Sequence, residues 1–175
     1  MTSISIHCLS SSELEAEAEK LAEIMAQTVG DGAAIGYMQP FSRADGLAFF
    51  TEQVFAEVRA GRRRLLVAKL DGETVGTVQL ITALPPNQPH RCEVAKMMVA
   101  PKARRRGVGR ALMQALDAEA RADGKTLVTL DTKTGDVAEP LYRAAGFVEA
   151  GVIPSYALDP DGAAVHATTY MYKAL

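Results

Sequence analysis

The sequence is poor in the features that mark several large classes of protein. It has two cysteines in 175 residues, which are too few for a disulfide framework, and no cysteine and histidine spacing typical of a zinc site. Its apolar runs reach about half of the ~20 residues that a membrane-spanning helix needs. Its first residues lack the basic flank, apolar stretch and cleavage site of a secretion signal. We therefore expect a cytoplasmic protein without a metal site.

Charge of one sign is not in excess either. The formal net charge is −2 at pH 7, unlike that of a general nucleic-acid binder. A hydrophobic fraction of 48% and a charged fraction of 23% are ordinary for globular proteins and argue against disorder. We expect one domain over residues 1–175, with no linker, and neither nucleic acid nor membrane among its partners.

The spacing of apolar residues predicts an α/β fold. Helical spacing occurs over about 10–28, 42–61, 106–123 and 137–145. Alternation predicts strands over 3–9, 63–70, 73–82, 91–99 and 125–131, then an antiparallel pair, 147–153 and 164–173, joined through 155–162. The strand–helix–strand unit over 91–131 makes its two strands parallel, whereas the hairpins are antiparallel. The expected sheet is therefore mixed and mostly antiparallel.

The segment KARRRGVGRALM (102–113) concentrates positive charge between a predicted strand and a predicted helix. Free N–H groups and the helix dipole favour an anion at such a helix start. Gly107 and Gly109 remove the Cβ atoms that would keep a ligand from the backbone. The guanidinium groups of the arginines match phosphate oxygens. The segment thus predicts a site for a phosphate or pyrophosphate.

Other interpretations of this segment stay open. Gly107-x-Gly109 after a strand, with Asp131 about 20 residues on, is close to a dinucleotide-binding pattern, but Leu112 occupies the third glycine's place. The segment could also be a solvated cationic turn that only caps a helix. DNA binding is less favoured because no basic stripe or stacking aromatics extend the charge. No run fits a P-loop.

Two motifs, in the expected element order, resemble the GNAT N-acetyltransferases. RRRGVG (104–109) matches the pyrophosphate loop Arg/Gln-x-x-Gly-x-Gly/Ala, and LYRAAGF (141–147) matches the signature Leu-Tyr-x-x-x-Gly-Phe. The resemblance covers about 60–150 well, and 93–99 and 130–147 further resemble the tabtoxin-resistance acetyltransferases. It implies a single-domain acyl-CoA N-acyltransferase fold with helices on both faces of the sheet, acetyl-CoA as co-substrate and no metal.

The resemblance also implies where acetyl-CoA binds. Main-chain amides of the strand would hold pantetheine, and the tyrosine of the second motif aligns with the general acid that protonates the leaving thiolate. Gly135 stands where the family often has an asparagine that contacts pantetheine. The implied acetyl-CoA contacts are Met98, Val99, Arg104, Arg105, Arg106, Gly107, Val108, Gly109, Arg110, Ala138 and Tyr142.

An amine acceptor must lose a proton before it attacks, because a lysine-like amine with a pKa of about 10.4 is charged at neutral pH. Glu93 is the predicted base, acting through a water, and we expect Ala95, Met97 and Val99 on its face, where apolar neighbours would raise its pKa. Asp131 ends the adjacent strand, where it could hold the ammonium or share the role of base. A solvated edge carboxylate and a turn cap are the alternatives for these two acids.

The acceptor side is the least defined part of the expected site. The substrate contacts we expect are Tyr37, Phe41, Glu93, Asp131 and Tyr156, with the three aromatic residues as a wall. The resemblance suggests a small amino-acid-like amine, toxins and antibiotics included. An N-terminal acetyltransferase of proteins and an acyl-CoA sensor without turnover are the alternatives. A homodimer is a further expectation from the resemblance alone.

Overall fold

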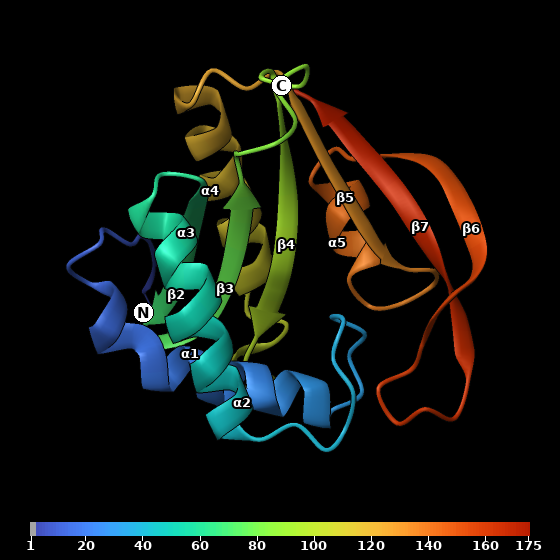
Figure 1. The fold of residues 1–175 in the computed structure, drawn as a ribbon, viewed down its shortest axis with the longest axis horizontal. Helices are drawn as coiled ribbons and strands as arrows, with labels where there is room; N and C mark the ends of the chain where they lie inside the picture. Colours follow the sequence, from blue (N-terminus) through green and yellow to red (C-terminus); the bar gives the residue numbers. More distant parts are fainter. Residues whose placement is uncertain (1–2) are drawn as a thin grey trace.

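The computed structural model describes residues 3–175 and contains one seven-stranded mixed sheet (Figure 1). Residues 1–2 of the predicted domain lie outside the described part. The strands are β1 (Ile4–Cys8), β2 (Arg63–Leu70), β3 (Glu73–Ile81), β4 (Arg91–Val99), β5 (Leu127–Lys133), β6 (Val148–Leu158) and β7 (Val165–Ala174). Their order is β1-β2-β3-β4-β5-β7-β6, and only the β4–β5 pair is parallel. The mixed, mostly antiparallel sheet predicted from the sequence is confirmed.

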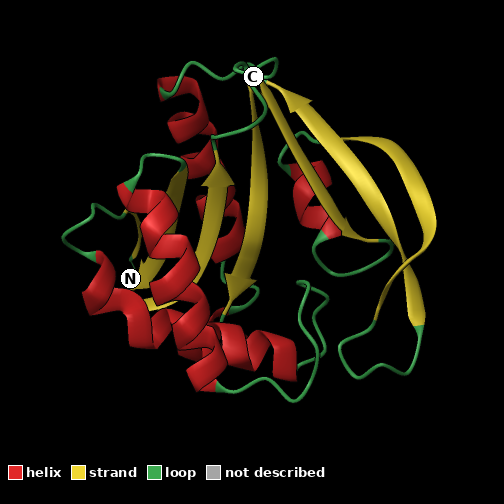
Figure 2. Cartoon of the chain, viewed as in Figure 1, coloured by secondary structure: helices red, strands yellow, loops and turns green. Residues whose placement is uncertain are grey.

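Helices cover both faces of this sheet, as Figure 2 shows. On one face lie α1 (Leu14–Gly30), α2 (Arg43–Ala48), the π-helical η1 (Phe49–Val54) and α3 (Phe55–Arg59); on the other lie α4 (Val108–Ala122) and α5 (Glu139–Ala144). A short 3₁₀ helix, η2 (Pro101–Ala103), follows β4. Each helical layer buries its own apolar core against the sheet. Within residues 3–175, no helix combines the length and apolarity needed to cross a membrane.

The strands β4 and β5 pair only over their first residues. Their parallel register runs from Arg91 opposite Leu127 to Glu93 opposite Thr129. Beyond that point the two strands separate, as both ribbon views show (Figures 1 and 2). The rest of β4 therefore presents an open edge in the middle of the sheet, because among the described strands only β3 pairs with it there.

A β-bulge interrupts β4 beside this open edge. The register between β3 and β4 shifts between Thr77 and Gln79, so that Lys96 and Met97 together oppose Val78. Lys96 has a φ of 50°, in the left-handed region that side chains other than glycine rarely adopt. A bulge of this kind bends the strand and redirects its side chains.

The bulge makes one prediction about the face of β4 wrong. We expected Glu93, Ala95, Met97 and Val99 to share a face. Instead, Met97 and Val99 pack against the core beneath α4, to which Cys92 also belongs. Since Glu93 follows Cys92 directly, alternation puts Glu93 and Ala95 on the opposite face. The extra residue at the bulge is the physical reason, because it reverses which residues face each side.

Two predicted elements differ in extent from the observed ones. The helix predicted over 42–61 starts with the capping box of Ser42 and Asp45, but its middle is π-helical. The strand predicted over 147–153 continues as β6 to Leu158, so part of the segment expected to join the last two strands is itself strand. Its register is irregular around Pro154, which has no N–H group to donate to the ladder.

The loop between α1 and α2 reaches the turn between β6 and β7. The Gln39 backbone N–H donates to the Pro160 carbonyl over 2.7 Å. The Gln39 side chain also donates to the Val29 carbonyl, over 2.8 Å, at the end of α1. Figure 1 shows this loop beside the β6–β7 turn, below the separated ends of β4 and β5 in the view. Two segments that are far apart in the sequence are thus joined below the separated strands.

Candidate functional site

The loop between η2 and α4 carries a run of free main-chain amides. In the described chain, residues 105–110 donate none of their backbone N–H groups to a carbonyl outside the helix ladder, and Gly107 gives α4 no side-chain cap. The next amide, that of Ala111, donates to the Gly107 carbonyl over 3.0 Å and starts the regular helix. Such consecutive donors at a helix start attract an anion.

Two left-handed residues shape this loop. Arg105 has a φ of 59° and Gly107 a φ of 85°. Alternation of left- and right-handed residues turns successive N–H groups towards one point, which forms a concave anion site called a nest. Only glycine adopts this conformation without steric cost, so Gly107 is a requirement of the loop's shape.

Gly109 joins the loop to the second sequence motif. A Cβ atom at Gly109 would lie 3.0 Å from Cδ2 of Leu141 on α5. This contact is tighter than ordinary packing allows, so the glycine lets the start of α4 approach α5 closely. The two motifs that carry the resemblance are therefore in direct contact.

The arginines of the loop fall into two groups. Arg104 is held in place: its Nε donates to the Val99 carbonyl over 3.1 Å, and its Nη1 pairs with Asp31 at 2.9 Å. The other arginines of the loop, 105, 106 and 110, are exposed and make no ion pair within residues 3–175. The unpaired guanidinium groups are free to meet a ligand, whereas Arg104 fixes the loop against the end of α1.

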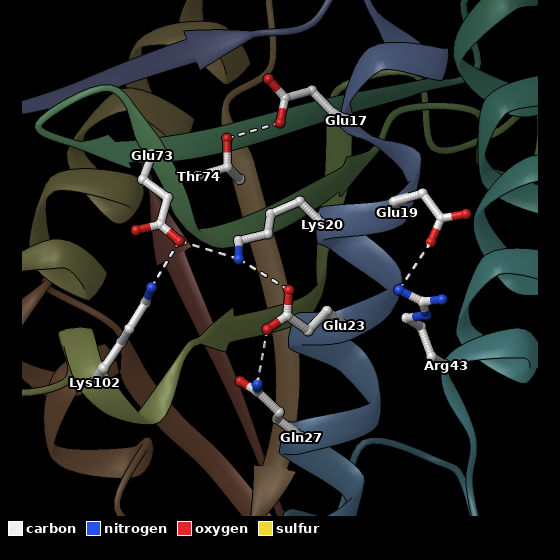
Figure 3. Close-up of polar contacts among 9 residues, drawn as sticks. All are labelled: Glu17, Glu19, Lys20, Glu23, Gln27, Arg43, Glu73, Thr74 and Lys102. Atoms are coloured by element: carbon white, nitrogen blue, oxygen red, sulfur yellow. Dashed lines mark hydrogen bonds and ion pairs between the residues drawn. The ribbon is translucent and has the colours of Figure 1, made fainter.

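A network of ion pairs anchors the start of the loop (Figure 3). Lys102 pairs with Glu73 at the start of β3, over 2.6 Å, and Glu73 pairs in turn with Lys20 of α1, over 3.0 Å. Lys20 also pairs with Glu23 at 2.9 Å. The loop is thereby attached to α1 and to the sheet, which reduces the ordering cost of binding a ligand.

These observations test whether the residues fit the pyrophosphate of acetyl-CoA. The free amides, the left-handed glycine and the unpaired guanidinium groups together form a positively polarised site at a helix start. The open edge of β4 ends at Val99, directly before η2 and this loop. Ala100 donates its N–H to Val75 of β3 over 2.8 Å, so alternation turns the N–H of Val99 away from β3, towards the separated β5. The residues present fit this ligand.

Tyr142 lies on α5, buried with 6% of its surface exposed. Its ring packs edge-on against Phe147, with ring centres 6.1 Å apart. Burial raises the pKa of the Tyr142 phenol, and the charges of Asp131 and Asp136 add to this effect. The phenol therefore keeps its proton at neutral and moderately alkaline pH.

Glu93 stands where β4 and β5 begin to separate. Its carboxylate pairs with Arg91 over 3.3 Å, and the same guanidinium donates to Thr129 over 2.5 Å. With 39% of its side chain exposed, Glu93 has a polar and partly solvated surrounding instead of the apolar one we expected. This leaves room for the water that the predicted role requires.

Asp131 lies on β5, opposite Tyr170 of β7. It is exposed and accepts a hydrogen bond from Thr168 over 3.1 Å. The Tyr170 hydroxyl lies 2.9 Å from that of Tyr156. This hydrogen bond and burial, with the charges of Asp131 and Glu93 among the further causes, raise the pKa of Tyr170 to about 12. Tyr170, which the sequence did not predict, thus lies beside two predicted site residues, Asp131 and Tyr156.

The predicted aromatic wall is in two parts. The Tyr37 ring lies 5.0 Å from Phe41 and 5.5 Å from Phe49, edge to face in both cases. These three rings line a surface hollow of about 360 Å³. Tyr156 instead packs against Tyr170, 6.1 Å away, and no ring contact joins the two groups within residues 3–175.

Two further residues were not found from the sequence. Lys96, at the bulge, lies with its Nζ 5.6 Å from the centre of the Tyr37 ring. Arg63, at the start of β2, donates to Gln79. They belong to different strands and to no contiguous motif, so the pattern of neither strand singles them out.

Comparison with known proteins identifies a family that the chain matches. Residues 31–147 match the family described as acetyltransferase (GNAT) family. An IAA acetyltransferase of Azospirillum brasilense is 34% identical over 98 residues, which are 55% of this chain and 62% of that protein. The curated relatives are matched over only 36% to 62% of their own length.

Solved structures share the fold. A ribosomal-protein-alanine N-acetyltransferase from Brucella melitensis has a TM-score of 0.79 at 24% identity, covering 98% of this chain and 99% of its own. A Salmonella typhimurium structure that contains acetyl-CoA, described as its cofactor, has a TM-score of 0.77 at 19% identity, covering 99% and 94%. The narrower likeness to the tabtoxin-resistance group stays a prediction.

Proposed function

The chain belongs to the acetyltransferase (GNAT) family, and from that premise we propose that it acetylates the primary amine of a small amino-acid-like molecule, with acetyl-CoA as donor. The loop over residues 104–110 carries the proposal. It presents a run of free amides and unpaired arginines beside the open edge of β4. Phosphates held there leave the acyl end within reach of the separated strands, where the acceptor would meet it in a ternary complex.

Acetyl-CoA supplies an acetyl group on a thiol whose ordinary pKa, about 8.5, makes it a good leaving group. Glu93, acting through a water, takes the proton that the ammonium must lose before its nitrogen attacks the thioester carbon. Once the new C–N bond has formed, the nitrogen gives its second proton to water. Tyr142, whose pKa is raised, gives its proton to the sulfur as the C–S bond breaks. Asp131 holds the incoming ammonium. The N–H of Val99 is positioned to polarise the thioester carbonyl.

The homodimer belongs to the proposal as well. Exposed apolar residues gather on the last hairpin: Val148, Val152, Ile153, Leu158 and Val165. Large exposed apolar areas often mark contact surfaces. Light scattering of the purified chain measures its mass in solution, and a monomer over the micromolar range would contradict this part.

Two measurements test the proposed function. Calorimetry with acetyl-CoA measures binding, and release of free thiol measures turnover across a panel of amino acids, amino-acid toxins, antibiotics, simple amines and short peptides. We expect binding, and thiol release with small amines. No binding of acetyl-CoA would contradict the proposal. Turnover with peptides alone would favour the N-terminal acetyltransferase, and binding without any turnover would favour the sensor.

A variant separates catalysis from binding. We expect Glu93→Gln to lower kcat by about 100-fold, the scale of general-base catalysis, with the affinity for acetyl-CoA unchanged. An unchanged kcat would show that Glu93 is only an edge carboxylate.

A further inference from the structure

Lys96 is a half-buried cation without an acidic partner. Its side chain lies over the Tyr37 ring, and within residues 3–175 it makes no hydrogen bond or ion pair. A Cβ atom at Gly36 would lie 3.7 Å from its Nζ. Cations that are removed from water are normally paired, because an unpaired buried charge is costly.

A second cation lies close to Lys96, because Arg63 donates to Gln79, which pairs with Ala95, the residue before Lys96. The Nε of Arg63 is buried without a partner, and so is Nε2 of the fully buried Gln79. Burial and then the charge of Arg63 lower the pKa of Lys96, whereas the charge of Asp131 opposes this effect. Two strands, β2 and β4, therefore contribute positive charge, and β2 and β3 contribute unused N–H donors. No carboxylate among the described residues is paired to either cation.

The place of Lys96 in the fold connects it with the acceptor. It is the bulged residue on the open edge of β4, between the aromatic group of Tyr37 and the strand that carries Asp131. Bulges next to active sites redirect side chains, and left-handed residues other than glycine persist where the surroundings hold them. The phosphate-binding loop lies further along the chain, so Lys96 is not needed there.

We propose that Lys96, with Arg63 close to it, binds the carboxylate of the acceptor, which makes the acceptor an amino acid instead of a simple amine. The inference rests on the proposed function and specifies its substrate class. A zwitterionic amino acid matches the charges of this region, because Lys96 meets its carboxylate while Asp131 and Glu93 meet its ammonium. The rings of Tyr37 and Phe41 favour an apolar side chain.

The test compares each acid with its own uncharged analogues. Methionine, leucine and phenylalanine are supplied with saturating acetyl-CoA, each as the free acid, the amide and the decarboxylated amine. We expect kcat/KM for the acids to exceed that for the amides by about 10- to 100-fold, the size of a charge-assisted hydrogen bond. Equal or better turnover of the amides, or turnover of none of the acids, overturns the inference.

Variants of Lys96 connect this preference to the residue. We expect Lys96→Met to remove the preference mainly by raising the KM of the acids, and Lys96→Arg to keep part of it. Arg121→Gln, which removes an exposed charge near the far end of α4, should leave the ratio of acid to amide unchanged. A full preference in Lys96→Met overturns the assignment.

Two control measurements, of folding and of acetyl-CoA binding, distinguish failure of this inference from failure of the variant or of the proposed function. Thermal melting establishes that each variant is folded, and if Lys96→Met does not fold, the wild-type ratio of acid to amide and the Lys96→Arg variant still decide. Calorimetry with acetyl-CoA separates this inference from the proposed function. Retained binding of acetyl-CoA, with amines lacking a carboxylate turned over as well as or better than the acids, overturns the inference alone, whereas loss of all binding overturns both.

Discussion

The two sides of the proposed site are built in different ways. In our proposal the donor side is a contiguous loop, residues 104–110, whose free main-chain amides and arginines bind the phosphates. The acceptor side is assembled from side chains on β2, β4, β5, β7 and the loop after α1. Main-chain recognition tolerates changes of side chain as long as the backbone keeps its shape. Side-chain recognition changes with each substitution, so an enzyme of this construction can keep its donor while its acceptor changes.

The largest effect is expected from a variant that slows the chemical step and leaves the binding of both ligands unchanged. We expect Tyr142→Phe to lower kcat by about 100-fold or more, because the phenol that supplies the proton is removed while the ring packing against Phe147 remains. Release of free thiol, measured at fixed times, gives kcat, and calorimetry checks that acetyl-CoA still binds. An unchanged kcat would assign Tyr142 to packing alone.

Removing an arginine should weaken the donor side without affecting the acceptor side. We expect Arg106→Ala to weaken acetyl-CoA binding by about 10-fold or more, the loss of one charge-assisted hydrogen bond. The loss should shrink at high ionic strength, since exposed charges are screened by salt. Calorimetry at two salt concentrations measures it, with Arg121→Gln as the control. Equal losses in both variants would mean that net charge alone attracts the donor.

A pair of glycines tests whether the backbone itself recognises the donor. Gly107 and Gly124 flank α4, both are left-handed, with φ of 85° and 69°, and neither has an atom closer than 3.9 Å to an added Cβ. We expect Gly107→Ala and Gly124→Ala to lose similar stability, about 1 kcal/mol each. Only the Gly107 variant should lose acetyl-CoA affinity, by several-fold. Equal affinities would contradict main-chain recognition at this loop.

The smallest expected effect is a difference in pH dependence. Burial and Arg63 lower the pKa of Lys96, opposed by Asp131, while Tyr37 also faces it. Lys96 therefore loses its charge at a lower pH than an exposed lysine with a pKa of about 10.4. We expect the preference for the acids to fall a few-fold between about pH 7 and 10 relative to Lys96→Arg, whose side chain stays charged. Acetyl-CoA affinity should stay flat, and a flat preference would contradict this prediction.

The glycine–arginine loop was predicted in its observed place, between β4 and α4, for a physical reason. A phosphate loop must place glycines, arginines and a helix start within a few residues, so all of its parts appear together in the sequence. The same holds for the parallel unit over 91–131, which follows from the order of its elements. The structure confirms the GNAT fold that the resemblance implied.

The acceptor side was harder to predict because its contacts come from distant segments. Lys96 and Arg63 are 33 positions apart by their numbering, and Tyr170 meets Asp131 only through the pairing of β7 with β5. The bulge at Lys96 is not visible in a pattern of alternating residues, so the prediction for the face of Glu93 was wrong. No local signal states how two strands will shift against each other.

The open edge of β4 has a consequence for the resistance of the chain to heat and proteases. A sheet with an open internal edge lacks the backbone hydrogen bonds that a neighbouring strand would supply there. A ligand that occupies this edge binds the native state and not the unfolded chain. Acetyl-CoA at 100 times its Kd would then add about 2.7 kcal/mol to the free energy of unfolding. We expect the lifetime of this protein in a cell to follow the supply of its donor.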